Sequence, residues 1–189
     1  MGNSNNSVIT GKLRGTLGKE LVFRDWEGKT VVAKAPGERK GEASPSQVQI
    51  QERFLLASRY AKAVITGQDQ GIRDAYNAAL RPRQNLYSRA LEDFLSLPEV
   101  KKIDAGNYTG VAGTKVVVRA LDDFRVTGVV VEIYAASGTL LEKGDAVQQI
   151  NGLDWTYTAT QANSPLTGSK IKAIATDVPG NQGIFEQKL

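Results

Sequence analysis

Hydrophobic and polar positions change their period twice along this 189-residue chain. Apolar residues alternate with polar ones near the start, recur every three or four residues over 45–95, and return to period two after Pro98. Period two indicates strands and a period near 3.6 indicates helices. The pattern therefore predicts an α+β protein with three parts. These are a Gly-rich arm and β-hairpin over 1–43, a helical unit over 44–98, and an all-β sandwich over 99–189.

The hairpin in the first part is predicted to turn at Glu27-Gly28, where glycine supplies a positive φ. This register pairs Phe23 with Val32, Val22 with Ala33, and Arg24 with Val31. One face then carries Leu21, Phe23 and Val32, and the other carries Val22, Trp26, Val31 and Ala33. Two apolar faces favour cover on both sides. The alternative is that helices of the same chain cover one face and leave Trp26 half-exposed.

The arm ahead of the hairpin carries Gly11, Gly15 and Gly18 at spacings of four and three. Glycine permits positive φ and close backbone approach, so the spacing predicts a bent or closely packed arm. A phosphate-binding loop would require the order G-x-x-x-x-G-K-[ST], and here Gly18-Lys19 is followed by Glu20. The motif is therefore absent.

The middle part begins with a strong helix start, because Ser44 can cap, Pro45 suits the first helical position and Gln47 completes a capping box. This helix is predicted to end at Gly67. A second helix is expected from about Asp69 and a third from about Pro82 to Leu95. The aromatic residues at helical spacing are predicted to be core: Phe54, Tyr60, Tyr76, Tyr87 and Phe94.

The last part contains about seven short period-two segments separated by turns. They are 101–106, 114–123, 126–136, 139–149, 154–160, 170–177 and 183–189. Seven short strands are the number in an immunoglobulin-like sandwich. Alternation places Trp155 and Tyr157 on one side and Thr156 and Thr158 on the other, so Trp155 is predicted to lie in or near the core.

The segments "ALDDFRVTGVVVEIYAASGTLLEKGDA", "LDWTYTAT" and "KIKAIATDVPGN" resemble bacterial Ig-like domains, in which an A-x-D-x-x-G-N turn joins the last two strands. Here that turn is Ala175, Asp177, Gly180 and Asn181. The whole layout, including "GKLRGTLGKELVFRDWEGKTVVAKAP" and "SPSQVQIQERFLLASRYAK", resembles a group of short Bacteroidota proteins. The resemblance implies an architecture and no particular activity.

The chain has no cysteine and no histidine. Disulfides and thiolate metal sites are excluded, and the commonest general base and transition-metal ligand are missing. No nucleophile-elbow, zinc or kinase signature is present. We therefore expect a protein that is not an enzyme and that needs no cofactor.

The net charge of +4 is uneven, because residues 1–98 hold 15 Lys and Arg against 10 Asp and Glu, a balance of +5. Basic residues on the predicted helices form a basic region: Arg53, Arg59, Lys62, Arg73, Arg81, Arg83 and Arg89. Acidic residues alternate with them at spacings that allow helix-surface ion pairs. We therefore expect weak, nonspecific polyanion binding at most.

The sequence has no run of about 18 apolar residues and no apolar signal-peptide core near its start. These features predict a cytoplasmic site of synthesis without membrane insertion. Work outside the cell would require lysis or a dedicated machine, with release as part of an assembly as one route. The loop carboxylates Asp122, Asp123 and Asp177 are candidate calcium ligands at one end of the sandwich. The alternative is that they form Asx-type turn bonds.

These features favour a structural protein: a self-associating subunit of a filament, phage particle or injection-type machine. The predicted subunit contact is the arm and hairpin, with interface residues Gly11, Gly15, Gly18, Leu21, Val22, Phe23, Trp26, Val31 and Val32. An arm that engages the next subunit makes a heterologous contact, which produces rings or filaments. The alternative is a monomeric Ig-like binding module for a glycan or nucleic acid.

Overall fold

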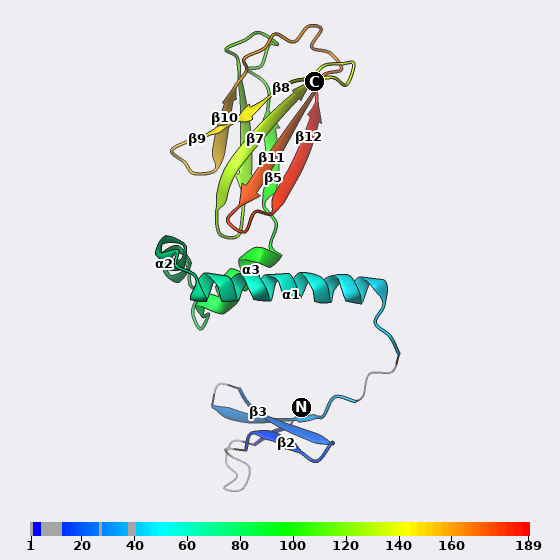
Figure 1. Cartoon of the computed structure of the whole chain (residues 1–189), viewed down its shortest axis with the longest axis vertical. Helices are drawn as coiled ribbons and strands as arrows, with labels where there is room; N and C mark the ends of the chain where they lie inside the picture. The colour runs from blue at the N-terminus through cyan, green and yellow to red at the C-terminus, as the bar shows by residue number, and fades with distance from the viewer. Residues whose placement is uncertain (1, 5–12, 27, 38–40) are drawn as a thin grey trace. The chain divides into compact units, whose positions relative to one another are not determined.

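The computed structural model describes residues 2–4, 13–26, 28–37 and 41–189. The described residues form three helices and three antiparallel four-stranded sheets, so the protein is α+β (Figure 1). The chain divides into two compact units, Met1–Ser44 and Pro45–Leu189. The predicted boundary between helices and sandwich stays a prediction, and in the structure both regions belong to the second unit.

The first unit is a single sheet in the order β1-β4-β3-β2. Its strands are β1 (Gly2–Ser4), β2 (Gly15–Leu17), β3 (Leu21–Trp26) and β4 (Lys29–Lys34). The predicted hairpin register is confirmed, because Phe23 pairs with Val32 and Trp26 with Lys29. Gly28 has φ 77°, the positive value that the tight turn requires. The sequence did not reveal that short strands would extend the hairpin on both sides.

The helical part consists of α1 (Pro45–Thr66), α2 (Gln70–Ala78) and α3 (Leu86–Leu95). The predicted ends of α1 are confirmed by its first residue, Pro45, and by Gly67 after its last. Asp69 is the N-cap of α2, where its carboxylate accepts a hydrogen bond from the Ile72 N–H at 3.0 Å.

The predicted start of the third helix near Pro82 was wrong by about one turn. Arg83 has φ 67°, which is incompatible with a right-handed helix, and the chain makes a turn in which Gln84 N–H donates to Arg81 O. The true N-cap is Asn85, whose side-chain oxygen accepts from the Ser88 N–H at 2.8 Å. A cap that satisfies a free N–H outweighs the preference of proline for a first turn.

The helices pack around Ala61, Tyr76 and Ala90, which are fully buried. Phe124 and Val178 from the β-region pack against this cluster, so the helices rest directly on one end of the β-domain. Among the predicted aromatic core residues, Tyr76 is buried, and the Tyr60 and Phe94 rings lie 5.4 Å apart. The prediction was wrong for Phe54, which is 53% exposed.

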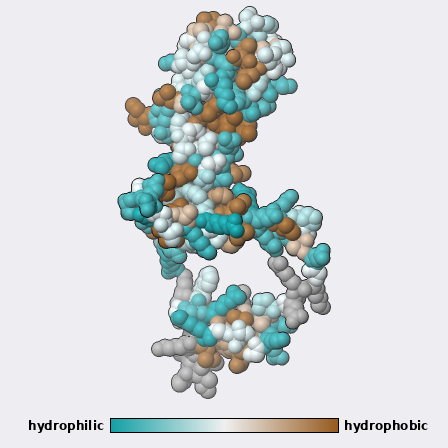
Figure 2. Space-filling model, in the orientation of Figure 1, coloured by the Kyte–Doolittle hydropathy of each residue, from teal (hydrophilic) through white to brown (hydrophobic). Residues whose placement is uncertain are grey.

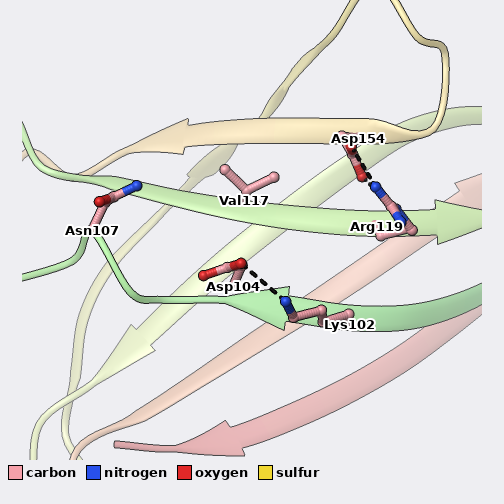
Figure 3. A pocket seen from close by; sticks show the side chains of 6 residues that line it. All are labelled: Lys102, Asp104, Asn107, Val117, Arg119 and Asp154. Atoms are coloured by element: carbon pink, nitrogen blue, oxygen red, sulfur yellow. Dashed lines mark hydrogen bonds and ion pairs between the residues drawn. The ribbon is translucent and has the colours of Figure 1, made fainter.

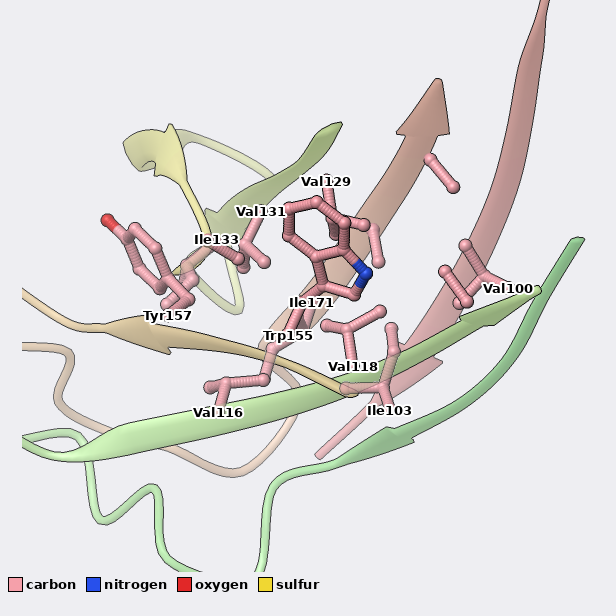
Figure 4. Packing of buried hydrophobic residues seen from close by; sticks show 14 of the residues in the cluster. Val100, Ile103, Val116, Val118, Val129, Val131, Ile133, Trp155, Tyr157 and Ile171 are labelled. Carbon is pink, nitrogen blue, oxygen red and sulfur yellow. The ribbon is translucent and has the colours of Figure 1, made fainter. Parts of the chain in front are cut away.

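The β-domain contains two sheets. One has the order β5-β6-β10-β9 and the other β12-β11-β7-β8. The strands of the first are β5 (Glu99–Asp104), β6 (Lys115–Leu121), β9 (Val147–Gln148) and β10 (Asp154–Thr158), and those of the second are β7 (Val126–Tyr134), β8 (Leu140–Asp145), β11 (Lys170–Asp177) and β12 (Gln182–Lys188). Both sheets contribute side chains to one core (Figure 4).

Trp155 lies in this core at 6% exposure, as the alternation predicts, with Tyr157 beside it on β10. Val118 on the neighbouring strand and Val129 on the opposite sheet belong to the same cluster (Figure 4).

The segment 139–149, predicted as one strand, is two strands in different sheets. β8 pairs with β7, whereas β9 pairs with β10. Between them Ala146 is buried and its N–H donates to Val129 O. A small buried residue at this point lets the chain cross from one sheet to the other, a change that periodicity cannot reveal because alternation continues through it.

Candidate assembly interface

The sheet of the first unit is the candidate interface, and its conformation is set by local interactions. The Asp25 carboxylate accepts from the Gly28 N–H at 3.0 Å and from Arg14 Nη2 at 2.7 Å. These bonds, with the backbone bond from Gly28 foremost, lower the pKa of Asp25 below its usual value. The same carboxylate thus stabilises the β3–β4 turn and joins it to the residue preceding β2.

In the structure, the described glycines of the arm occupy positions with positive φ. Gly15 has φ 107° within β2 and Gly18 has φ 59° in the β2–β3 turn. A Cβ at either position would meet nothing within 4 Å among the described residues. Glycine is therefore favoured here by the positive φ and not by the close approach of another residue. Gly11 lies outside the described residues. The expectation that these glycines approach a neighbouring subunit stays a prediction.

Both faces of this sheet present apolar side chains to solvent. Leu17 pairs with Leu21 across β2 and β3, which adds it to the face of Leu21, Phe23 and Val32. Leu17 is 63% exposed, and Trp26 on the opposite face is 70% exposed. Among the described side chains of this unit Thr30 is buried, but no apolar side chain is. The sheet therefore has no hydrophobic core of its own among these residues.

The face that carries Trp26 is also hollowed. Arg24, Trp26, Val31 and Ala33 line a depression whose surface is mostly apolar. Val22 and Val31 on this face are half-buried. Hydrophobic side chains also reach the surface elsewhere on the molecule (Figure 2). A depression of this kind offers a place for an apolar side chain of a partner.

The loop carboxylates proposed as calcium ligands have protein partners. Asp122 accepts from the N–H groups of Phe124 and Arg125 at 3.0 and 2.9 Å. Asp177 accepts from the Asn181 N–H at 2.6 Å. Of the residues that the structure describes, no three or more acidic side chains are grouped so that they could hold a metal ion. The observed bonds are the Asx-type turn bonds expected as the alternative.

Asp123 forms the junction between the helices and the β-domain. Its carboxylate is within 2.6 Å of Arg81 Nη2 and 2.5 Å of Arg89 Nη1, and Arg89 Nη2 donates to the Asp123 backbone oxygen at 2.9 Å. Partial burial raises the pKa of Asp123, but these two guanidinium groups outweigh burial and hold the pKa below its usual value. Arg89 is 2% exposed. Part of the basic region predicted on the helices is therefore engaged in ion pairs within the protein and is not available to a partner.

A buried hydrogen-bonded chain of Tyr60, Tyr76 and Asp93 lies at the same junction, and sequence reasoning missed it. Tyr76 Oη donates to Asp93 Oδ2 at 2.5 Å, and the Tyr60 and Tyr76 hydroxyls are 2.8 Å apart. Since the single Tyr76 hydrogen goes to Asp93, Tyr60 must donate to Tyr76. Burial raises the pKa of Asp93 to about 6. The only signal in the sequence was an aspartate on the apolar stripe of a short helix.

A polar depression occurs on the β-domain, lined by Lys102, Asp104, Asn107, Val117, Arg119 and Asp154 (Figure 3). Arg119 Nε and Nη2 bind the two Asp154 oxygens at 2.7 and 2.8 Å, which with Asn151 lowers the Asp154 pKa to about 2. Lys102 Nζ lies 3.0 Å from Asp104 Oδ2. The charged groups here neutralise one another.

No helix among the described residues combines the length and the apolar character needed to cross a membrane. No protein-family model matches the chain, and no curated protein matches it.

Three solved structures show weak similarity. An engineered protein shares 23% identity over 64% of this chain with a TM-score of 0.32. The S-layer protein rSbsC(31-844) and the surface layer protein SbsC, domains 1–6, each share 15% identity over 75% of this chain, with TM-scores of 0.33 and 0.30. The chain spans between 22% and 27% of the length of these proteins. TM-scores this low support no conclusion about fold or function.

Proposed function

We propose that the protein is a self-associating structural subunit, a building block of a filament, phage particle or injection-type machine, and that the sheet of its first unit makes the subunit contact. One observation carries the proposal. This sheet exposes Leu17 on one face and Trp26 on the other, and none of its described apolar side chains is buried. A sheet of this size requires a covered hydrophobic face to be stable.

Subunit association would supply that cover. Burying a large apolar side chain contributes about 1.5–3 kcal/mol, so contacts on both faces add a substantial driving force. The outer strands β1 and β2 are three residues each, and they leave backbone groups available for strand addition from another chain. The interface residues predicted from the sequence lie on this sheet, with the exception of Gly11, which is outside the described residues.

We further propose that the β-domain is an immunoglobulin-like sandwich of the bacterial kind, as the resemblance to Bacteroidota proteins implies. The support is strand order: β5-β6-β10-β9 corresponds to strands A, B, E and D of that fold, and β12-β11-β7-β8 corresponds to G, F, C and an added edge strand. The fold by itself implies no particular activity. The lack of histidine and cysteine, together with the lack of catalytic motifs, supports a role that is not enzymatic.

The experiment is light scattering on the full chain over a range of concentrations. Wild type should form species larger than a monomer, and Trp26→Ser should shift the equilibrium to monomer. Trp26 is 70% exposed, so its replacement leaves folding intact. Phe23→Asp, which places a charge on the opposite face, tests that face separately.

The matched control is Val147→Ser, since Val147 is 71% exposed on the β-domain. It removes a similarly exposed apolar side chain outside the proposed interface and should leave the mass unchanged. If wild type is a monomer at every concentration, the assembly proposal fails. The polar depression around Arg119 and Asp154 then becomes the first surface to test, for the alternative function of a monomeric glycan-binding module.

A further inference from the structure

Positive charge flanks Trp26 on its face of the first sheet. This Trp26 face presents Val22, Arg24, Trp26, Lys29, Val31 and Ala33. Arg24 lies two residues before Trp26 on β3, and Lys29 is paired directly with Trp26 across the turn, so the three side chains share one face. Directly paired residues have Cβ atoms about 5 Å apart, which places a cation beside the indole.

The strands of this sheet bring no acidic side chain to the Trp26 face. Asp25 is the one acidic residue within β1–β4; it lies on the opposite face and forms an ion pair with Arg14. Glu20 precedes β3, four residues from Arg24. Within the described residues neither Arg24 nor Lys29 forms an ion pair, so both cations are available to a partner.

The Trp26 face is hollowed along its length. The mostly apolar depression that Arg24 and Trp26 line is followed by a second depression, to which Lys19 and Val22 contribute. Val22 pairs with Ala33 of the first depression, so the two adjoin. Together they form a groove with an exposed indole near one end and a lysine near the other.

We propose that the Trp26 face binds single-stranded nucleic acid, with a base stacked on the Trp26 indole and the neighbouring phosphates paired with Arg24 and Lys29. Proteins that bind single strands without sequence preference combine a positively charged groove with aromatic side chains on which bases stack. The planar base matches the apolar lining of the depression, and the phosphates supply the anions that the two cations lack.

Shape and position favour a nucleic acid strand over other anionic partners. A bilayer is contacted by apolar side chains that protrude into it, whereas Trp26 lines a hollow. An acidic peptide strand would add to a sheet through the backbone groups of an edge strand. Arg24, Trp26 and Lys29 instead lie on the two inner strands of the order β1-β4-β3-β2.

This inference goes beyond the proposed function and does not rest on it. The opposite face, with Leu17, Leu21 and Phe23, stays available for subunit contact while a strand occupies the Trp26 face. A bound strand competes only with a subunit contact made through Trp26 itself. Because the groove offers few cations, we expect weak binding without sequence preference, with a Kd of about 10–100 µM at about 150 mM salt.

The test is fluorescence anisotropy of a labelled oligothymidylate of about 15 nucleotides, titrated with the full chain. Trp26→Ser should weaken binding at least about fivefold, because it removes the stacking surface. Arg24→Gln and Lys29→Gln should each weaken binding and reduce the slope of log K against log salt by about 0.7. Oligouridylate of the same length distinguishes RNA from DNA as the natural ligand.

The matched control is Lys34→Gln. Lys34 is also an exposed lysine of β4, but it pairs with Leu21 and therefore lies on the opposite face. The substitution removes the same charge from the same strand, and it should leave binding unchanged.

Tryptophan fluorescence reports the stacking directly. The chain has two tryptophans, and Trp155 is buried in the core of the β-domain. Quenching by an unlabelled oligonucleotide therefore belongs to Trp26, and it should disappear in Trp26→Phe, which keeps an aromatic ring and most of the affinity.

Binding that is unchanged in Trp26→Ser, or equally weakened in Lys34→Gln, would overturn the inference. Equal affinity for a duplex of the same length would do so too, because duplex bases are not free to stack on a side chain. Binding to vesicles of phosphatidylcholine and phosphatidylglycerol, without binding to oligonucleotides, would identify a membrane surface instead and refute the nucleic acid.

Light scattering without nucleic acid tests the proposed function separately. Leu17→Ser, on the opposite face, should weaken subunit association and leave strand binding unchanged. A chain that associates but binds no strand retains the proposed function and loses this inference, and a monomer that binds strands does the reverse.

Discussion

Replacing Asp93 by asparagine should make the protein less sensitive to pH between about pH 4 and pH 7. Asp93 is fully buried, its Oδ2 accepts from Tyr76, and its Oδ1 has no hydrogen-bond partner among the described residues. Burial raises its pKa from the ordinary 3.8 to about 6, and the nearby carboxylates of Asp122 and Asp177 add to this. The carboxyl group is therefore best accommodated in its protonated form.

The magnitude follows from the difference between the folded and unfolded pKa values. A raised pKa means that the folded protein holds its proton more tightly, so the stabilisation is complete below about pH 4 and is lost as pH rises through about 6. Two pKa units correspond to about 3 kcal/mol of unfolding free energy. Asparagine is neutral at every pH, so it does not incur this loss.

The assay is urea denaturation of wild type and Asp93→Asn at a series of pH values. The difference in unfolding free energy, variant minus wild type, should increase by about 3 kcal/mol between about pH 4 and pH 7. Taking the difference cancels the titration of every group that does not interact with Asp93. Asp123→Asn is the control of opposite sign, because the pKa of Asp123 is lowered and its charged form stabilises the fold.

A difference that stays constant with pH would refute the reasoning, since it would mean that Asp93 titrates equally in both states. A difference that falls as pH rises would mean that the charged form is stabilised, which contradicts burial as the dominant cause of the shift.

Three further substitutions test the β-domain. Trp155→Ala should lower the unfolding free energy by about 3–5 kcal/mol in urea titrations, because the indole lies in the core. Gly183→Ala should reduce the melting temperature strongly, since its Cβ would lie 1.8 Å from Pro98 O, whereas Gly128→Ala, with nothing within 4 Å, should change it little. Glu142→Ala should destabilise by about 1–3 kcal/mol, because it removes the acceptor for donors from Tyr157, Thr160 and Gln161; an unchanged urea midpoint would contradict this.

Local sequence patterns were sufficient to predict much of the secondary structure without knowledge of the tertiary contacts. Pro45 is the first residue of α1 and Gly67 follows its last, and the turn at Gly28 sets the register that pairs Phe23 with Val32. These features were predictable because each depends on residues close in sequence, where steric and hydrogen-bonding preferences act directly. The buried position of Trp155 was predictable for a similar reason, since alternation along one strand assigns its faces.

The two apolar faces of the hairpin were predictable from the sequence, whereas their role as a subunit interface stays a prediction. Sequence alternation identified two apolar faces on the hairpin, and the structure adds Leu17 to one of them through β2. It also assigns Gly15 and Gly18 to positive-φ positions. Glycine spacing indicated unusual backbone geometry but could not distinguish a turn from close packing against a neighbour, because both require the absence of a Cβ.

Other features depended on residues far apart in sequence and were decided only by the tertiary structure. Arg89 resembled a surface cation until Asp123, 34 positions later, was placed beside it. Asp93 became a buried carboxyl because Tyr76 and the β-domain enclose it, and the strand at 139–149 was divided at Ala146 because its halves find partners in different sheets. Phe54 lies on an apolar stripe yet stays exposed, since helical periodicity specifies a face and not how far the neighbouring helices reach. Burial and pairing are properties of the space around a side chain, and only the folded chain specifies that space.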